Sequence, residues 1–468
     1  MMSLIWKIAL NDWRRLWHAR IPAMLMLVLM VLWAVAILAA HHHWQDHARN
    51  VEEVTQRSQH DWQSQPDRHP HRVSHYGDFV AKPVHPLSVI EPGILDQSGH
   101  LVYLEAHRLN SANFNPATEA TSLGRFPLIT PAMIVQWWIP LFLIMIAYAN
   151  VTADKMTSIL AFMRGNGVPG WAIAGGKWLA LFLPLFFLLC VQAVLAFAWS
   201  WHSEQVWSRL GMMLLAQSFY IAGWCLLVVT VSWYSRQLHG ALLALLICWV
   251  CICIIVPRGL ANIAQISHPT QPRSEAEYDA ETKLRTLGDS HNADDPHFAA
   301  FKASILKKYH VSTVEDLPVN YHGLLMQEGE RLTTAVYREQ QMLHDTQLAR
   351  QNESIRNWLW LTPALALQYI QMAGSGNDLP HHQAFIRQAE ERRYQLIQYL
   401  NQIHTFKVQQ HDDKNTRVSA DFWKKAPRPP VHLSPLSVSK QSILAGFLVL
   451  LGWLLLPAYL LFKVSHRL

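Results

Sequence analysis

The sequence contains few charged residues and few cysteines for its length. Asp, Glu, Lys and Arg make up 15% of the 468 residues, whereas apolar residues make up 51%. Such a low charge density is unusual for a soluble protein of this size. All five cysteines lie inside apolar runs, so the long polar regions hold none from which a disulfide framework could form. The composition favours a membrane protein with large water-facing parts.

The sequence also lacks nucleotide-binding, metalloprotease and nucleophile–base motifs. Its nearest approach to a phosphate-binding loop is GWAIAGGKW (170–178). Here Lys177 comes one residue late, and Trp178 stands where Ser or Thr would hold Mg²⁺. We therefore expect the chain not to be an enzyme and to bind no cofactor itself. Any ATP and Mg²⁺ would be bound by a separate ATPase subunit.

Six apolar runs of about twenty residues are long enough to cross a bilayer. They lie at 21–40, 133–151, 178–199, 211–233, 238–256 and 442–462. Two long polar regions separate some of them, at 41–132 and 257–441. The predicted fold class is an all-α polytopic membrane protein with six transmembrane helices and two extracytoplasmic domains. The first domain is expected to be small and α+β, and the second mainly helical.

Lys and Arg gather in the short segments beside these runs, which predicts the orientation of the chain. The basic residues before the first run, in the segment 152–177, in one short turn and in the tail 463–468 are Lys7, Arg14, Arg15, Arg20, Lys155, Arg164, Lys177, Arg236, Lys463 and Arg467. With six spans all these segments share one side, so both termini are predicted to be cytoplasmic in a cell inner (plasma) membrane. This placement explains the net charge of +6 without nucleic acid as a partner.

Residues 1–20 are predicted to form an interfacial amphipathic helix. Trp6, Trp13 and Trp17 lie on one helical face, and Arg14 and Arg15 lie on the other. Such a helix would rest against the inner leaflet of the bilayer. The alternative is an ordinary topology-setting N-terminus, which leaves the orientation unchanged.

The segment 152–177 is predicted to begin with a short amphipathic helix, capped by Thr152 or Asp154 and ended by Gly165 and Gly167. Its candidate coupling residues are Asp154, Lys155, Met156, Ile159, Leu160, Met163 and Arg164. A helix of this kind at the cytoplasmic surface is suited to dock into a cleft on a partner. The alternative is an interfacial re-entry loop without a partner.

The polar regions have their own patterns. Residues 41–62 are predicted to extend the first span as a helix, and residues 100–107 alternate like a short strand. Three amphipathic helical patterns, at 294–310, 323–360 and 381–403, predict a long helical hairpin that stands off the membrane.

Histidine is unusually frequent, with 26 residues. His69, His71 and His75 are candidate ligands, because neutral imidazole binds Zn²⁺ or Cu²⁺. The alternative is that they lie on polar helix faces and in turns. The spans themselves contain Gln136, Gln192 and Gln217 as their main polar residues. Their lack of charge argues against an ion-coupled carrier and favours amphipathic or lipid-like cargo, or transmitted force.

Several stretches resemble ABC-2-type export permeases, in particular the subgroup with two large extracytoplasmic insertions. This subgroup is related to the gliding-motility permeases and to the permease of the nitrous-oxide-reductase copper-maturation system. The stretches are HPHRVSHYGDFVAKPVHPLSVIEPGI (69–94), GHLVYLEAHRLN (99–110), GRFPLITPAMIVQ (124–136), GNGVPGWAIAGGK (165–177), YHVSTVEDLPVN (309–320) and LTPALALQYIQMAGSGNDLPHHQAFIRQAEERR (361–393).

The resemblance implies a permease subunit powered by a dimer of cytoplasmic ABC ATPases and paired with a sister permease or a second copy of itself. Such permeases carry a Glu-Arg-Glu-x-Gly-Thr-Leu-like coupling helix, for which this chain has DKMTSIL (154–160). Only the first two charges and the final Leu are kept in kind. Further partners would be the bilayer and a periplasmic protein. Two other functions remain open: a membrane-anchored periplasmic metal-handling protein, and a mechanotransmitting scaffold.

Overall fold

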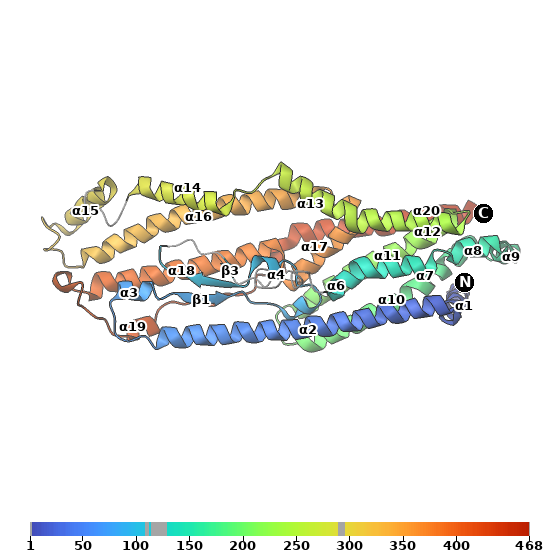
Figure 1. Cartoon of the computed structure of the whole chain (residues 1–468), viewed down its shortest axis with the longest axis horizontal. Coiled ribbons are helices and arrows are strands. Elements are labelled where there is room, and N and C mark those ends of the chain that lie inside the picture. The colour runs from blue at the N-terminus through green and yellow to red at the C-terminus, as the bar shows by residue number, and fades with distance from the viewer. Residues whose placement is uncertain (1, 108–111, 114–128, 289–294, 468) are drawn as a thin grey trace.

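The computed structural model describes the whole chain except residues 1, 108–111, 114–128, 289–294 and 468. The molecule is long and mostly helical (Figure 1). At one end lies a helical bundle, from which both termini emerge on the same side. At the other end, helices and a small sheet form what we call the distal domain. We call the outer end of the bundle, where the termini lie, its terminal end.

Among the described residues, six helical segments are long and apolar enough to cross a membrane, and each contains one of the six apolar runs. They are α2 (Arg20–Gln63); α6 (Pro131–Met133), η2 (Ile134–Trp138), α7 (Ile139–Ala147) and α8 (Asn150–Met156); α10 (Gly170–Ser200); α11 (Val206–Tyr234); α12 (Leu238–Val250), η3 (Cys251–Ile255) and α13 (Val256–Ser267); and η6 (Leu436–Ser439) with α20 (Lys440–Arg467). The prediction of a helical multi-pass membrane protein is confirmed at this level.

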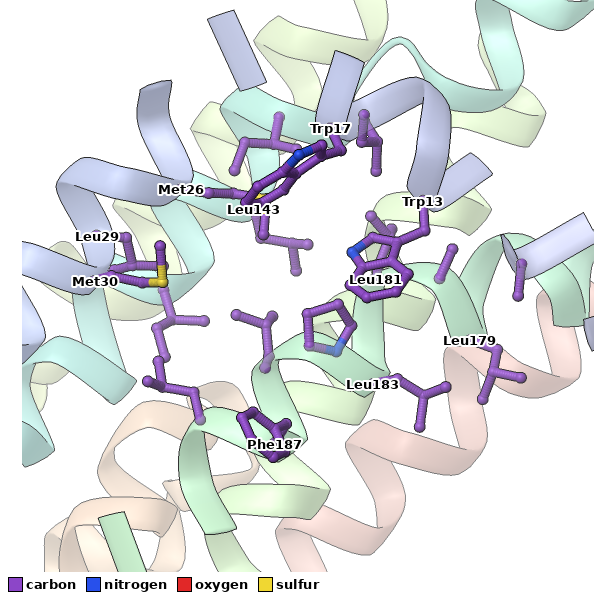
Figure 2. A pocket seen from close by; sticks show the side chains of 18 of the residues that line it. Trp13, Trp17, Met26, Leu29, Met30, Leu143, Leu179, Leu181, Leu183 and Phe187 are labelled. Carbon is purple, nitrogen blue, oxygen red and sulfur yellow. The ribbon is translucent and has the colours of Figure 1, made fainter. Parts of the chain in front are cut away.

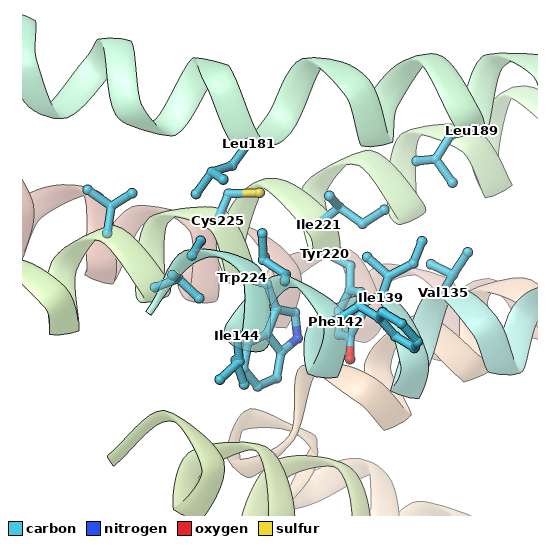
Figure 3. Packing of buried hydrophobic residues seen from close by; sticks show 14 of the residues in the cluster. Val135, Ile139, Phe142, Ile144, Leu181, Leu189, Tyr220, Ile221, Trp224 and Cys225 are labelled. Atoms are coloured by element: carbon cyan, nitrogen blue, oxygen red, sulfur yellow. The ribbon is translucent and has the colours of Figure 1, made fainter. Parts of the chain in front are cut away.

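The core of the bundle lies between α7, α10 and α11, where apolar side chains interdigitate (Figure 3). Pro140 of α7 has no N–H to donate to the Gln136 carbonyl, which lies four residues earlier in the π-helical turn η2. The Tyr220 hydroxyl donates to this oxygen at 2.5 Å, and the Cys253 thiol lies 3.6 Å from it. The irregular turn is therefore stabilised by side chains from two neighbouring helices.

The glutamines of the spans are hydrogen-bonded to side chains of other helices. Gln192 donates to Gln217 at 3.2 Å and accepts from the Trp33 indole at 3.2 Å. Gln136 donates to Gln371 at 2.7 Å. Hydrogen bonds between apolar helices hold them together, because an unpaired amide in such surroundings is costly.

In the distal domain, the first insertion packs against the extended end of α2, as the predicted continuation of the first span implies. Near that end the Ser58 hydroxyl donates to Asp78 Oδ1 of the first insertion at 3.1 Å. The Trp62 indole donates to the Trp423 carbonyl of the second insertion at 2.8 Å. The described strands form an antiparallel sheet in the order β1-β2-β3; the predicted strand at 100–107 is confirmed by β2. Bounds are α3 (Pro70–Ser74), β1 (Asp78–Ala81), η1 (Pro86–Val89), α4 (Leu95–Ser98), β2 (Leu101–Leu104) and β3 (Ala112–Asn113). The parts of this predicted domain at 108–111 and 114–128 lie outside the described residues.

The second insertion contains the three predicted amphipathic helices, which are α15 (Pro296–Tyr309), α16 (Tyr321–Asn357) and α18 (Leu379–Lys407). Helices α16 and α18 lie side by side as the long hairpin (Figure 1). The other elements are α14 (Arg273–Leu287), η4 (Leu359–Leu361), α17 (Pro363–Ser375), η5 (Gln410–Asp412) and α19 (Asp421–Lys424).

The connection between the arms of the hairpin differs from the expectation that all of 257–441 stands outside the membrane part. It is helix α17, which packs between α11 and α20, with Leu367 and Ile370 in the bundle core. Thr362, the N-cap of α17, donates to the Ile252 carbonyl in η3 at 2.7 Å. Gly446 of α20 allows the close approach, because a Cβ there would lie 2.9 Å from the Ala366 carbonyl.

A buried loop after η1 joins the first insertion to the start of α18. The Asn377 amide donates to the Ser88 hydroxyl at 2.8 Å, and the Asn377 carbonyl accepts from the Ile94 N–H at 3.0 Å. Glu91 in this loop is buried and accepts from the Gly93 N–H at 2.9 Å. Burial raises the pKa of Glu91 from its ordinary 4.5 to about 7, although the Gly93 hydrogen bond opposes this shift.

The raised pKa of Glu91 makes the free energy of unfolding depend on pH. Because the folded state holds the Glu91 proton more tightly than the unfolded state, its contribution is fully present below pH 4.5 and is lost as the pH rises through about 7. In the wild type this loss lowers the free energy of unfolding by about 3 kcal/mol, so the melting temperature falls between pH 5 and pH 8. We expect the fall in melting temperature to be smaller in Glu91→Gln. Glu353→Gln, at an exposed position, is the control and should leave the wild-type pH profile unchanged. Equal profiles for wild type and Glu91→Gln would contradict the assignment.

The N-terminal helix α1 (Met2–His18) packs on α10 at a contact that requires glycine. A Cβ at Gly176 would lie 2.6 Å from Ile8 Cγ2 and 2.7 Å from Ile8 Cβ, whereas a Cβ at Gly175 would meet only Ile5 Cδ1, at 3.8 Å.

This difference gives a matched pair of variants. Gly176→Ala and Gly175→Ala gain the same helix propensity, but only Gly176→Ala overfills the contact, at a cost of about 1–3 kcal/mol. We expect the melting temperature in detergent to fall for Gly176→Ala and to hold or rise for Gly175→Ala. If both variants melt together, α1 is not seated on α10 as described.

Candidate functional site

The segment after the second span is two helical pieces rather than one. Helix α8 continues the span through Met156, and the chain then turns at Ser158, whose φ is 60°. A second short helix, α9 (Ile159–Gly165), follows. The expected helix start at Thr152 or Asp154 is therefore wrong: both residues are buried within α8. The reason is that both side chains bind other helices: the Thr152 hydroxyl donates to the Ser232 carbonyl, and Asp154 pairs with Lys177.

Asp154 belongs to a group of charged residues that we call the charge cluster: Asp12, Asp154 and Lys177, which are buried, and Arg15, which is half exposed. The Lys177 ammonium lies 2.6 Å from Asp154 Oδ2 and 3.0 Å from Asp12 Oδ2, and Arg15 Nη1 lies 3.2 Å from Asp154 Oδ1. Lys177 also donates to Asn150 Oδ1 at 2.7 Å. The cluster ties α1, α8 and α10 together at the terminal end of the bundle.

Two further basic residues of the predicted coupling set bind carbonyls at the ends of helices. Lys155 Nζ donates to the Trp233 and Ser235 carbonyls, each at 2.5 Å, at the end of α11. Arg164 Nη1 donates to the Ser465 carbonyl near the end of α20 at 3.0 Å. Cations at these places satisfy carbonyls that have no helical partner. The charged members of the predicted set therefore serve internal contacts.

The apolar members divide between inside and outside. Leu160 is buried and Met163 is partly buried against the core, whereas Met156 is 62% exposed and Ile159 is 38% exposed. Phe162, which the sequence reasoning did not single out, is 73% exposed. Its spacing of three residues from Ile159 was the available signal. Met156, Ile159 and Phe162 form an exposed surface that we call the apolar tip.

The N-terminal helix borders an apolar cavity of about 600 Å³ between α1, α2, α7 and α10. Figure 2 shows Trp13 and Trp17 of α1 at this cavity together with Met30, Leu143 and Phe187. Trp6 also lines it. On the other side of α1, Arg14 is exposed and Arg15 reaches the charge cluster. Helix α1 thus has the predicted apolar and polar faces. Arg15 on the polar face, however, binds Asp154.

The three candidate metal ligands are divided between two neighbouring groups. His71 and His75 lie with His107, and His69 lies with His404 and Asp413. Burial first, and then the neighbouring imidazoles, lower the pKa of His71 to about 4. Sequence reasoning missed His107 and His404. The spacing of the histidines indicates part of this grouping. His71 and His75 are four residues apart and share a helix face, whereas His69 and His71 are two residues apart and do not.

Comparison with known proteins gives a match within the second insertion only. The family described as a domain of unknown function, DUF3526, matches residues 273–428, a third of the chain, which spans α14 to α19. No curated protein and no solved structure matches the chain.

The charge cluster yields a stability prediction. Lys177→Met leaves the buried Asp12 and Asp154 with only the half-exposed Arg15 as a cation, and breaking a buried pair in this way costs about 3–5 kcal/mol. The exposed pair of Arg285 with Glu281 contributes about 0–1 kcal/mol, so Arg285→Met is the control. We expect thermal unfolding in detergent to shift clearly downward for Lys177→Met alone. A shift no larger than that of the control would mean that the cluster does not hold α1 to the bundle.

Proposed function

We propose that the chain is the permease subunit of an ATP-driven exporter of the ABC-2 type, powered by a separate cytoplasmic ATPase dimer. In this proposal the terminal end of the bundle faces the cytoplasm of a cell inner membrane, and the distal domain faces the periplasm. The permease acts with a sister permease or a second copy of itself.

The observation that carries the proposal is the apolar tip. Exposed Met156, Ile159 and Phe162 stand at a turn beyond the end of a membrane-spanning helix, on the side of both termini. The charged residues beside them, Asp154, Lys155 and Arg164, bind other helices of the bundle. A rigidly held apolar tip is suited to enter a cleft on a partner, because exposed apolar patches mark interaction sites.

The charge cluster supplies a route from such a contact into the bundle. A push on α9 reaches α8 directly, and through Asp154 it reaches Lys177 of α10 and Arg15 of α1. The apolar cavity borders these same helices, so a movement of α1 against α10 would change its shape. An apolar cavity between membrane-spanning helices suits amphipathic or lipid-like cargo.

Helix α17 favours a second function, in which force is transmitted to the distal domain without cargo. It lies in the bundle core and continues into the hairpin formed by α16 and α18. Movement of α11 or α20 would therefore be carried to the distal domain. This second function requires the same ATPase and the same apolar tip.

The apolar tip can be tested by substitution in the full chain, purified with its ATPase from native membranes. We expect Ile159→Asp/Phe162→Asp to reduce the amount of ATPase retained and the ATP hydrolysis of the purified material at least tenfold, because the carboxylates would have to be buried in the partner's cleft. Tyr278→Asp, which changes an aromatic residue of similar exposure in the distal domain, is the control and should retain both.

The sidedness of the tip is a separate measurement. A Phe162→Cys variant should react with a membrane-impermeant maleimide in inverted vesicles and not in spheroplasts. Labelling from the periplasmic side would overturn the topology, and full function without any ATPase would overturn the exporter.

A further inference from the structure

Three imidazoles meet in the distal domain where α3 approaches the end of β2. His71 lies on α3, His75 ends it, and His107 follows β2 by three residues. One ring nitrogen of each lies within 4.8 Å of the other two. The ring centroids are 4.9 Å apart for His71 and His75, 5.6 Å for His75 and His107, and 6.3 Å for His71 and His107.

The local backbone holds these rings in place. His71 and His75 are four residues apart, so both project from one side of a helical turn. His107 has a φ of 59°, a conformation uncommon for residues with a Cβ but more frequent for His than for most. Its N–H donates to Glu330 Oε2 at 3.4 Å, and its carbonyl accepts from the Tyr337 hydroxyl at 3.4 Å. Long helix α16 thereby fixes the loop that carries His107.

Carboxylates stand behind two of the three rings. Glu105 Oε1 lies 3.5 Å from His75 Nδ1, and Glu330 Oε2 lies 3.0 Å from His107 Nδ1. Glu330 is itself buried and paired with Arg393. A carboxylate at Nδ1 keeps the proton on that nitrogen and leaves the Nε2 lone pair for a metal, which is the arrangement behind most metal-bound imidazoles. The third ring, His71, has a buried Nδ1 that finds no hydrogen-bond partner among the described residues.

We propose that His71, His75 and His107 bind a divalent transition-metal ion, with Glu105 and Glu330 as the supporting carboxylates and one position open to water or to an outside ligand. Three nitrogen donors suit Zn²⁺ or Cu²⁺ rather than Ca²⁺ or Mg²⁺, which prefer oxygen, or Cu(I), which prefers sulfur. Tetrahedral Zn–N bonds place nitrogens about 3.3 Å apart, so the rings close by a small rotation around the ion. The His75 side chain is 41% exposed, which gives the ion a path to the site.

The neighbouring group of His69, His404 and Asp413 has other uses for its polar atoms. His69 Nδ1 accepts from the His71 N–H at 3.2 Å and so caps α3. Asp413 Oδ1 accepts from the Asn320 amide and lies within hydrogen-bond distance of His404 Nε2, each at 2.7 Å. These contacts account for the group as part of the fold, and it serves as the internal control.

The test uses the full chain in detergent, stripped with EDTA and titrated with Zn²⁺ against a chromophoric chelator. We expect one equivalent of Zn²⁺ per chain and a rise in melting temperature on binding. His75→Gln/His107→Gln should weaken binding at least tenfold and abolish the rise. His404→Gln, which changes the neighbouring group without touching the cap of α3, and the exposed pair His42→Gln/His60→Gln should bind as the wild type does.

A replacement ligand separates loss of the metal site from loss of folding. His75→Cys keeps a donor atom at the same place, so we expect it to retain Zn²⁺ and, loaded with Co²⁺, to show a sulfur-to-cobalt charge-transfer band that the wild type lacks. The proposal is overturned if the wild type binds no Zn²⁺ at micromolar concentration, if binding survives in His75→Gln/His107→Gln, or if it is lost in His404→Gln instead. None of these outcomes depends on the transport proposal.

Discussion

One buried lysine holds the terminal end of the bundle together. Lys177 is 1% exposed and reaches Asp12 of α1, Asp154 of α8 and the Asn150 side chain at once. Each carboxylate would be costly to bury alone, so the three helices are stable in one mutual arrangement. The consequence is that the last turn of the second span, the N-terminal helix and the third span behave as one unit, and α9 projects from that unit rather than from a flexible loop.

The distal domain is connected to the bundle in a comparably specific way. It does not simply follow the spans, because α17 returns into the bundle core between α11 and α20. Arg209 of α11 donates to the carbonyl of Gly374, in the last turn of α17, and to the carbonyl of Ser434, just before η6 and α20. A domain held by a buried helix transmits changes of the bundle, whereas a domain on loose linkers would move independently.

Much of the fold could be predicted because its elements have strong local patterns. Six apolar runs, the extension of α2, the strand at β2 and the arms of the hairpin all follow from periodicity and length. Helix α17 could not be placed, because LTPALALQYIQ is too short to span a bilayer and its burial depends on Gly446, far along the chain. The candidate sites were predictable only in part. Asp154 was expected at the surface because its partners, Arg15 and Lys177, lie on other helices, and His107 is brought to His71 and His75 by the sheet.

The continuity of α2 has a geometric consequence. Its 44 residues form one helix from Arg20 to Gln63, and the part beyond the first apolar run is about 35 Å long at 1.5 Å per residue. The Trp62–Trp423 hydrogen bond clamps its far end to the hairpin side of the distal domain. Such a rod magnifies small angles: a tilt of about 10° inside the bilayer carries Trp62 sideways by about 6 Å. Rotations too small to open the helical bundle would thus suffice to displace the outermost part of the molecule by the width of a side chain.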